Sequence, residues 1–131
     1  MRVSASAGTL APALAVDGRN DTRWGSGQPQ HPGQEFRIVF DSPQAIRCVW
    51  YDISKWRSDY PRLLEIDAKL ADGTKKQLLT TEQYLGIRYL SGGQDVDYFC
   101  FDSTTVSELS LIQQGADPVF DWSIAELKFF K

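Results

Sequence analysis

Residues 15–27, with the sequence AVDGRNDTRWGSG, hold a dense group of oxygen-bearing side chains. Asp17, Asn20 and Thr22 offer carboxylate, amide and hydroxyl oxygens within six positions. Hard cations such as calcium bind about six to eight oxygens, and the backbone carbonyls of an irregular turn can supplement the side chains. The three residues are therefore candidate cation ligands. The alternative is an Asx-turn network, in which Asp17 and Asn20 bond their own backbone.

A second source of oxygen lies near the other end of the chain, in the segment SIAEL. Glu126 stands between Ala125 and Leu127, so its carboxylate belongs to an apolar segment. A carboxylate in apolar surroundings needs a partner, and a cation shared with the Asp17 turn would provide one. We therefore expect the two ends of the chain to meet around such a cation.

A third group of side chains suits sugar recognition, in which an aromatic ring stacks on a pyranose and polar side chains bond its hydroxyls. The segment 54–62, SKWRSDYPR, combines both kinds of side chain after a predicted strand. The alternative is that its rings cover the end of the core while its charges are solvated. Loops 25–34 and 113–122 add further candidates. The predicted ligand-binding residues are Trp56, Arg57, Asp59, Tyr60, Arg62, His31, Asp117 and Phe120.

Catalytic motifs are not found in the sequence. His31 is the only histidine, and it lies in a loop rich in glycine, proline and glutamine. No GxSxG, P-loop, GxGxxG or HExxH pattern is present, and the spacing of the acids singles out no catalytic pair. The sequence therefore predicts a protein that is not an enzyme.

Length, charge and hydropathy narrow the class of protein further. The 131 residues suit one domain spanning 1–131. The net charge is −3 and the only basic cluster is the pair Lys75-Lys76, so nucleic acid is not an expected partner. No apolar run approaches the roughly 18 residues of a membrane span. Paired apolar spikes are not evident either, which argues against membrane lipid, and no secretory signal is visible.

Cys48 and Cys100 lie in two separate apolar, strand-like runs. We expect two buried free thiols that act as small apolar side chains. A disulfide is the alternative if the two strands are neighbours. The chain has no CxxC and no cluster of cysteine and histidine, which argues against zinc.

The elements that must position these residues are almost all strands. Apolar and polar residues alternate over short runs that turn signals separate, as in an antiparallel sandwich or jelly roll. Asp72-Gly73 predicts a hairpin. Residues 82–90 fit a strand or a short helix, and 9–16 fit a helical turn. The predicted strands cover 35–40, 45–53, 63–73, 75–80, 96–103, 108–115 and the last part of 122–130.

Several of these motifs together resemble the discoidin-like domains, also called the coagulation-factor C-type or galactose-binding-like fold. The early motif is A-x-DG-x-x-x-T-x-W, from Ala15 to Trp24. It is followed by EFRIVFDSPQAIRCVWY, by ADG after an alternating strand, and by WSIAEL near the end. The resemblance covers about residues 3–130.

The resemblance implies an all-β, eight-stranded antiparallel jelly-roll β-sandwich with a structural calcium. Asp17, Thr22 and Glu126 would supply side-chain ligands, and backbone oxygens would come from near Ala15, Asn20 and Ala125. Trp24 would pack into the core beside the ion and stiffen the turn. Many bacterial members bind sugars through loops at one end of the sandwich.

The resemblance and the candidate residues together predict a carbohydrate-binding module that serves as an accessory domain of a larger, extracytoplasmic protein. The carbohydrate would be galactose-type or another glycan. The alternative is a structural or protein-interaction domain of a larger protein, which would dock through the same loops and have no sugar site.

Overall fold

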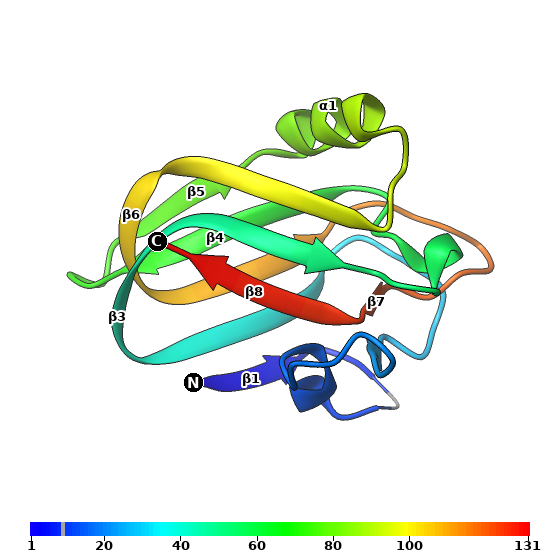
Figure 1. The fold of residues 1–131 in the computed structure, drawn as a ribbon, viewed down its shortest axis with the longest axis horizontal. Coiled ribbons are helices and arrows are strands. Elements are labelled where there is room, and N and C mark those ends of the chain that lie inside the picture. The colour runs from blue at the N-terminus through cyan, green and yellow to red at the C-terminus, as the bar shows by residue number, and fades with distance from the viewer. Residues whose placement is uncertain (9) are drawn as a thin grey trace.

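The computed structural model describes residues 1–8 and 10–131, and these residues form eight strands, one α-helix and two short 3-10 helices (Figure 1). In chain order they are β1 (Arg2–Ala5), η1 (Pro12–Ala15), β2 (Trp24–Gly25), β3 (Gln34–Asp52), η2 (Arg57–Asp59), β4 (Leu64–Leu70), β5 (Lys75–Leu79), α1 (Thr81–Ser91), β6 (Val96–Gln113), β7 (Ser123–Ile124) and β8 (Glu126–Phe130).

Two long strands hold the fold together. β3 joins the predicted strands 35–40 and 45–53, and β6 joins 96–103 and 108–115. The pairing between them shifts in register between Val39 and Gln44, which is a bulge that lets one strand bend. Pro43 lies inside this bulge, between the paired residues Val39 and Gln44, where its missing N–H costs no ladder hydrogen bond.

The bend lets both long strands contribute to two layers. On one side of it, the order β1-β3-β6-β4-β5 forms one layer. On the other side, β8 pairs with the second half of β3, from Cys48 to Asp52, beside the first part of β6. β2 and β7 form a separate short pair. All these pairs are antiparallel, which confirms the predicted eight-stranded jelly-roll β-sandwich.

The structure confirms the predicted hairpin and helical turn, and it decides between the two interpretations of residues 82–90. The hairpin at Asp72-Gly73 joins β4 to β5. Residues 82–90, which fit either a strand or a helix, belong to α1, whose start is fixed by a capping box between Thr80 and Gln83. The helical turn expected in 9–16 is η1; residue 9 lies outside the described residues.

The expectation of two free thiols is wrong. Cys48 and Cys100 form a disulfide. They face each other on the neighbouring strands β3 and β6, and they lie on the outer face of the sheet, where Cys48 is half-buried and Cys100 is exposed. Strand alternation explains this position, because the buried residues Val49 and Phe99 are their immediate neighbours.

The described part of the chain contains no helix with the length and apolar character that a membrane crossing needs.

Candidate functional site

The structure brings the Asp17 turn and Glu126 together. The backbone N–H of Gly18 donates to Glu126 Oε2 over 3.0 Å, across 108 positions of sequence. Asp17 Oδ2 accepts from the Thr22 hydroxyl at 2.6 Å, and Asp17 Oδ1 accepts from the Arg19 N–H at 3.0 Å. The second bond is an Asx turn of Asp17, as the alternative interpretation required, whereas no side-chain bond of Asn20 is seen among the described residues. The same carboxylate thus shapes the turn and stands next to the second acid.

Glu126 is an unusual carboxylate because only 4% of its surface is exposed. Burial raises its pKa to about 7, the charge of Asp17 adds to this rise, and the bond from Gly18 opposes it. The pKa of Asp17 is lowered, chiefly by the bond from Thr22. Among the described residues, no lysine or arginine forms an ion pair with Glu126. Two neighbouring carboxylates without such a partner are a setting that a bound cation would relieve.

The remaining predicted ligands fit a hard cation through oxygen alone. No three histidine, cysteine, aspartate or glutamate side chains in the described part of the chain converge to hold a metal. A cation at Asp17 and Glu126 would therefore need Thr22, Asn20 and backbone oxygens near Ala15 and Ala125. Both alanines are fully buried, and Asn20 is exposed at the rim. Such a set, made only of oxygens, suits calcium better than zinc.

Trp24 anchors this turn to the core. Its side chain is buried, and its ring meets Phe36 and Trp122 edge-to-face at centroid distances of 5.0 and 4.9 Å. Gly8 passes so close that a Cβ there would lie 2.6 Å from Trp24 Nε1. The predicted packing of Trp24 in the core is thus seen.

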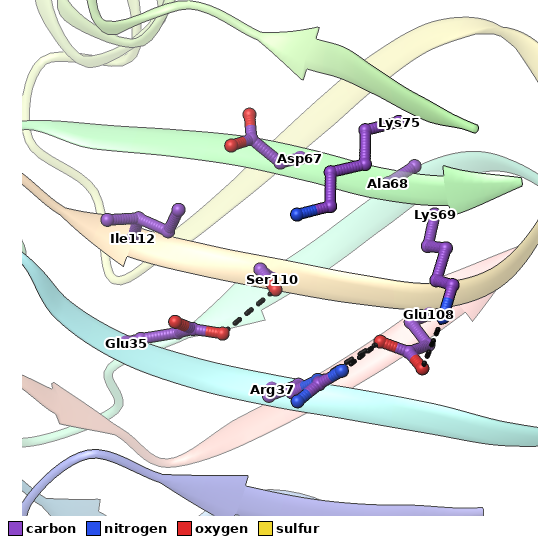
Figure 2. A pocket seen from close by; sticks show the side chains of 9 residues that line it. All are labelled: Glu35, Arg37, Asp67, Ala68, Lys69, Lys75, Glu108, Ser110 and Ile112. Carbon is purple, nitrogen blue, oxygen red and sulfur yellow. Dashed lines mark hydrogen bonds and ion pairs between the residues drawn. The ribbon is translucent and has the colours of Figure 1, made fainter. Parts of the chain in front are cut away.

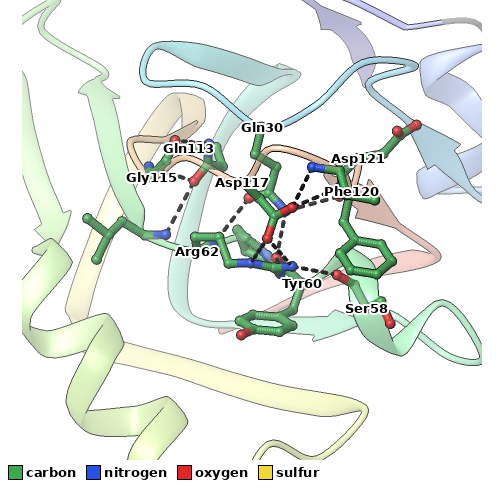
Figure 3. A network of polar contacts seen from close by, with 12 residues as sticks. Gln30, Ser58, Tyr60, Arg62, Gln113, Gly115, Asp117, Phe120 and Asp121 are labelled. Carbon is green, nitrogen blue, oxygen red and sulfur yellow. Dashed lines mark hydrogen bonds and ion pairs between the residues drawn. The ribbon is translucent and has the colours of Figure 1, made fainter.

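The predicted sugar-binding residues all lie at one end of the sandwich, where loops 25–34, 54–62 and 113–122 are gathered (Figure 1). Arg62 and Asp117 form the centre of this end (Figure 3). Arg62 Nε and Nη2 donate to Asp117 Oδ2 at 3.1 and 2.9 Å. Arg62 also donates to the carbonyls of Tyr60 and Ser58, at 2.7 and 3.0 Å.

Asp117 completes the brace by accepting the backbone N–H groups of Val119 and Phe120, both at 2.8 Å. Its pKa is lowered, first by these two bonds and then by Arg62. The polar groups of Arg62 and Asp117 therefore form most of their hydrogen bonds with other groups of the protein. They hold the loops in place and present Phe120 at the surface, where 41% of that residue is exposed.

Gln30 is a loop residue that the sequence analysis did not single out. It is buried, and its side chain accepts from the Arg62 N–H and donates to the carbonyls of Tyr60 and Asp121 (Figure 3). It thereby ties all three loops together. His31 follows it, is exposed, and accepts a bond from Gln113 through its backbone carbonyl. A lone glutamine in a loop carries no sequence signal for such a role.

The aromatic rings of segment 54–62 lie against cations of the protein itself. The guanidinium carbons of Arg62 and Arg88 lie 4.0 and 4.6 Å from the centre of the Tyr60 ring. Arg23 and Lys55 lie 5.2 and 5.1 Å from the Trp56 ring. These stacked cations hold the rings in fixed positions.

Asp59 and Arg57 face different partners. Asp59 Oδ2 accepts from the Ser123 hydroxyl at 2.7 Å, and Arg23 lies 3.7 Å from it. Arg57 pairs with Asp95 at 2.9 Å and remains largely exposed. Arg23, half-buried beside Trp56 and Asp59, is another residue that the sequence analysis missed, because it lies in the segment 15–27 that was considered for cation binding and not in a predicted sugar-binding loop.

Apart from the turn and the loop end, a hollow lies on the outer face of the layer that contains β4, and the sequence analysis did not predict it (Figure 2). Its volume is about 380 Å³, and we call it the charged groove; it is lined by Glu35, Arg37, Asp67, Ala68, Lys69, Lys75, Glu108, Ser110 and Ile112. Arg37 pairs with Glu108 and Ser110 donates to Glu35. Burial, together with nearby acids, raises the pKa of Asp67.

Solved carbohydrate-binding modules share this fold over nearly the whole chain. The family 32 module of NanJ from Clostridium perfringens, solved with galactose, is 18% identical with a TM-score of 0.77, over 99% of this chain and 93% of that one. Chitosan-binding module 1 from a chitosanase/glucanase of Paenibacillus sp. IK-5 is 20% identical with a TM-score of 0.77, over 99% and 94%. The CBM32 of AlyQ, solved with 4,5-unsaturated mannuronic acid, is 19% identical with a TM-score of 0.75, over 99% and 94%.

No protein-family model and no curated protein matches the sequence. The structural likeness nevertheless confirms, at the level of fold, the resemblance seen in the sequence motifs. The chain has the discoidin-like, galactose-binding-like fold of the family 32 carbohydrate-binding modules.

Proposed function

We propose that this chain is a non-catalytic carbohydrate-binding module, an accessory domain of a larger extracytoplasmic protein, with a structural calcium. The observation that carries the proposal is the loop end, where aromatic and polar side chains from three loops surround the half-buried Arg62–Asp117 brace. A rigid set of rings and hydrogen-bonding groups is what binding of a sugar demands.

The contacts of each residue suggest how the work is divided. Phe120 and Trp56 are the rings that we assign to stacking, and His31 and Arg57 are the exposed polar groups that we assign to hydroxyl contacts. Arg62, Asp117 and Asp59 are already bonded within the protein, and the Tyr60 ring is covered more closely than the Trp56 ring, because its cations lie at 4.0 and 4.6 Å rather than at 5.2 and 5.1 Å. In the proposal, these four residues and Gln30 mainly position the rings that stack on the sugar.

The module would bind weakly as a single site, because a shallow polar site leaves much of a sugar hydrated. Attachment to an enzyme or to a surface would raise the effective affinity through local concentration. Two of the similar modules are named with a galactose or mannuronic acid ligand, and one derives from a chitosanase/glucanase. These names support a glycan ligand and a parent enzyme.

Calcium fits the Asp17 turn on chemical grounds, because the oxygens there include two neighbouring carboxylates and Glu126 lacks an ion-pair partner among the described residues. A bound cation would tie the first turn to β8 and add stability without taking part in any reaction. The disulfide supports the extracytoplasmic assignment, since disulfides persist in oxidising compartments.

The proposal is tested by titrating the purified domain with galactose, oligogalacturonate, mannuronate and glucosamine oligomers while recording backbone and indole NMR signals. We expect shifts in loops 25–34, 54–62 and 113–122. Phe120→Ala and Trp56→Ala should each weaken binding by about two- to tenfold, the worth of one stacked ring. Tyr89→Ala is the matched control, because Tyr89 is an 87% exposed ring on α1, outside the three loops.

Silence of all three loops across this panel would contradict the sugar site and favour the alternative, a structural or protein-interaction domain. One observation supports that alternative. α1 exposes three apolar side chains, namely Leu85, Tyr89 and Leu90.

A further inference from the structure

The layer formed by β8 and the adjoining parts of β3 and β6 has an outer face that is unusually aromatic. Trp50 on β3 lies opposite Tyr98 on β6 and opposite Lys128 on β8. One row further along, the disulfide of Cys48 is flanked by Phe130. We call Trp50, Tyr98 and Phe130, with Lys128 and the disulfide between them, the aromatic face.

These side chains point outward because the intervening residues point inward. Val49, Phe99 and Leu127 are buried in the core. By contrast, 57% of Tyr98 and 45% of Phe130 remain exposed, and Trp50 is half-buried. The solvent-facing positions of an antiparallel sheet usually carry polar residues. A group of exposed rings at such positions marks a binding surface.

A hollow of about 490 Å³ adjoins the aromatic face, between it and the turn that begins at Asp17. Its walls are Trp50 and Lys128 from the sheet, Glu126 from β8, and residues 18–21 from the turn. Arg19 and Asp21 pair with each other at 2.7 Å on the rim and stay exposed. The hollow thus places one large ring beside several hydrogen-bonding groups.

This mixture of chemistry favours a carbohydrate over an apolar protein surface. A sugar ring has an apolar face that can stack on Trp50 and hydroxyls that can bond the exposed Arg19 or Asp21 on the rim. An apolar partner would bury the charged Arg19–Asp21 pair and replace none of the hydrogen bonds that the pair makes with water. Lys128 Nζ lies over the Trp50 ring, 4.6 Å from its centre, so this flexible side chain must move aside when a sugar stacks there, and its ammonium group can then donate to the hydroxyls of the ligand.

The aromatic face is also held rigid before any ligand arrives. The disulfide joins β3 to β6 one pair away from Trp50 and Tyr98, and β8 is bonded along the other side of β3. Fixing the rings in advance lowers the entropy lost on binding.

We propose that the aromatic face and its hollow form a second carbohydrate-binding surface, which stacks a sugar on Trp50 independently of the loop end. The inference rests on the proposed function, because it assigns the same ligand class to a separate surface. In Figure 1, β8 and β3 form the front of the sandwich, whereas the loops gather at its right-hand end. Two surfaces of this kind would let one module contact two parts of a polysaccharide.

The four tryptophans make the test site-specific. Trp50 reports on the aromatic face and Trp56 on the loop end, while the buried Trp24 and Trp122 serve as internal references. We expect titration with the same oligosaccharides to shift the Trp50 indole signal. Trp50→Ala and Tyr98→Ala should each weaken this second binding event about two- to tenfold, with the Trp56 response unchanged.

Tyr89→Ala serves again as the control for loss of an exposed ring, and unfolding curves establish that each variant is folded. Shifts at Trp56 without any at Trp50 would overturn the second surface and leave the proposed function standing. A Trp50 signal that responds only to protein concentration, with a dimer that Trp50→Ala dissociates, would overturn it in favour of self-association. Silence at both tryptophans would contradict the proposed function as well.

Discussion

The two outer faces of the sandwich are built from the same two strands and yet differ sharply. Before the bend of β3, its outward residues enter the charged groove, where Arg37 pairs with Glu108 and Ser110 bonds Glu35 (Figure 2). Beyond the bend, the outward residues are Cys48 and Trp50, on the aromatic face. The polar side chains of the charged groove pair mostly with one another, apart from Asp67, whose Oδ1 is buried without a hydrogen-bond partner among the described residues, whereas the rings of the aromatic face remain partly exposed. A face whose large side chains lack packing partners within the protein is the better candidate for binding a ligand.

Loss of the disulfide should have the largest effect, because it removes the covalent link that only the aromatic face has. Cys48→Ser with Cys100→Ser should lower the free energy of unfolding by about 2–4 kcal/mol, since the link closes a long loop of the unfolded chain. The measurement is denaturant unfolding of the variant and of the parent protein with and without reductant. Equal stability of all three would show that the link contributes nothing.

The matched control for this variant lies on the other face. Ser107→Ala with Ser110→Ala removes the hydrogen bonds of two hydroxyls, to the Lys69 and Leu70 carbonyls and to Glu35, near the charged groove and leaves the aromatic face intact. These bonds to partly exposed groups should matter less, by about 1 kcal/mol or less each. A control as damaging as the cysteine variant would remove the contrast between the faces.

The next largest effect concerns two glutamates with opposite surroundings. Glu126, beside the aromatic face, has its pKa raised to about 7 by burial, whereas Arg37 lowers the pKa of Glu108 in the charged groove. A folded pKa above the unfolded value of about 4.5 means that the calcium-free protein loses stability as pH rises from about 4.5 through 7. Calcium displaces that proton, so its stabilising effect should grow over the same interval.

Thermal unfolding in calcium and in chelator, at pH 5 and pH 8, measures this effect. At a calcium concentration about 100 times its Kd, the gain at pH 8 should be about 2.7 kcal/mol, and Glu126→Gln should abolish it. Asp102→Asn is the control, because Asp102 is an exposed acid away from the turn. A melting temperature that changes neither on addition of chelator nor in the Glu126→Gln variant would contradict the calcium proposal.

The sequence predicted the strands and the meeting of its two ends better than it predicted what each face does. The alternation of apolar and polar residues determines which residues share a side of β3. The need of Glu126 for a partner, together with the oxygens of the Asp17 turn, predicted that the two ends of the chain meet. Alternation does not say which side is inside, so Cys48 and Cys100 were expected in the core and lie on the outer surface. The bond between them depends on a register that pairs positions 52 apart, and spacing along the chain does not show it.

The candidate sugar-binding residues teach a similar lesson. The predicted residues come from three loops that lie at one end of the sandwich, but residue type could not separate those that face solvent from those that brace the loops. Arg62 and Arg57 are the same type of residue, and only their partners distinguish them. Arg62 bonds Asp117 and two backbone carbonyls, whereas the Arg57 side chain stays largely exposed. Gln30 and Arg23 were missed because their roles depend entirely on three-dimensional neighbours.

The smallest effect should come from the ion pair in the charged groove. Arg37→Gln should cost about 0.2–1 kcal/mol at low salt, because the Arg37 side chain is about half exposed, and less at high salt. Since Arg37 lowers the folded pKa of Glu108, the pair stabilises the protein above the unfolded pKa of about 4.5, and this contribution is lost as pH falls through the folded value. Unfolding curves of the variant and parent should therefore converge at low pH, the opposite of the dependence set by Glu126. A difference that persists unchanged at low pH and in high salt would mean that Arg37 acts through packing of its aliphatic stem, and the two faces would then differ less in their electrostatics than the structure indicates.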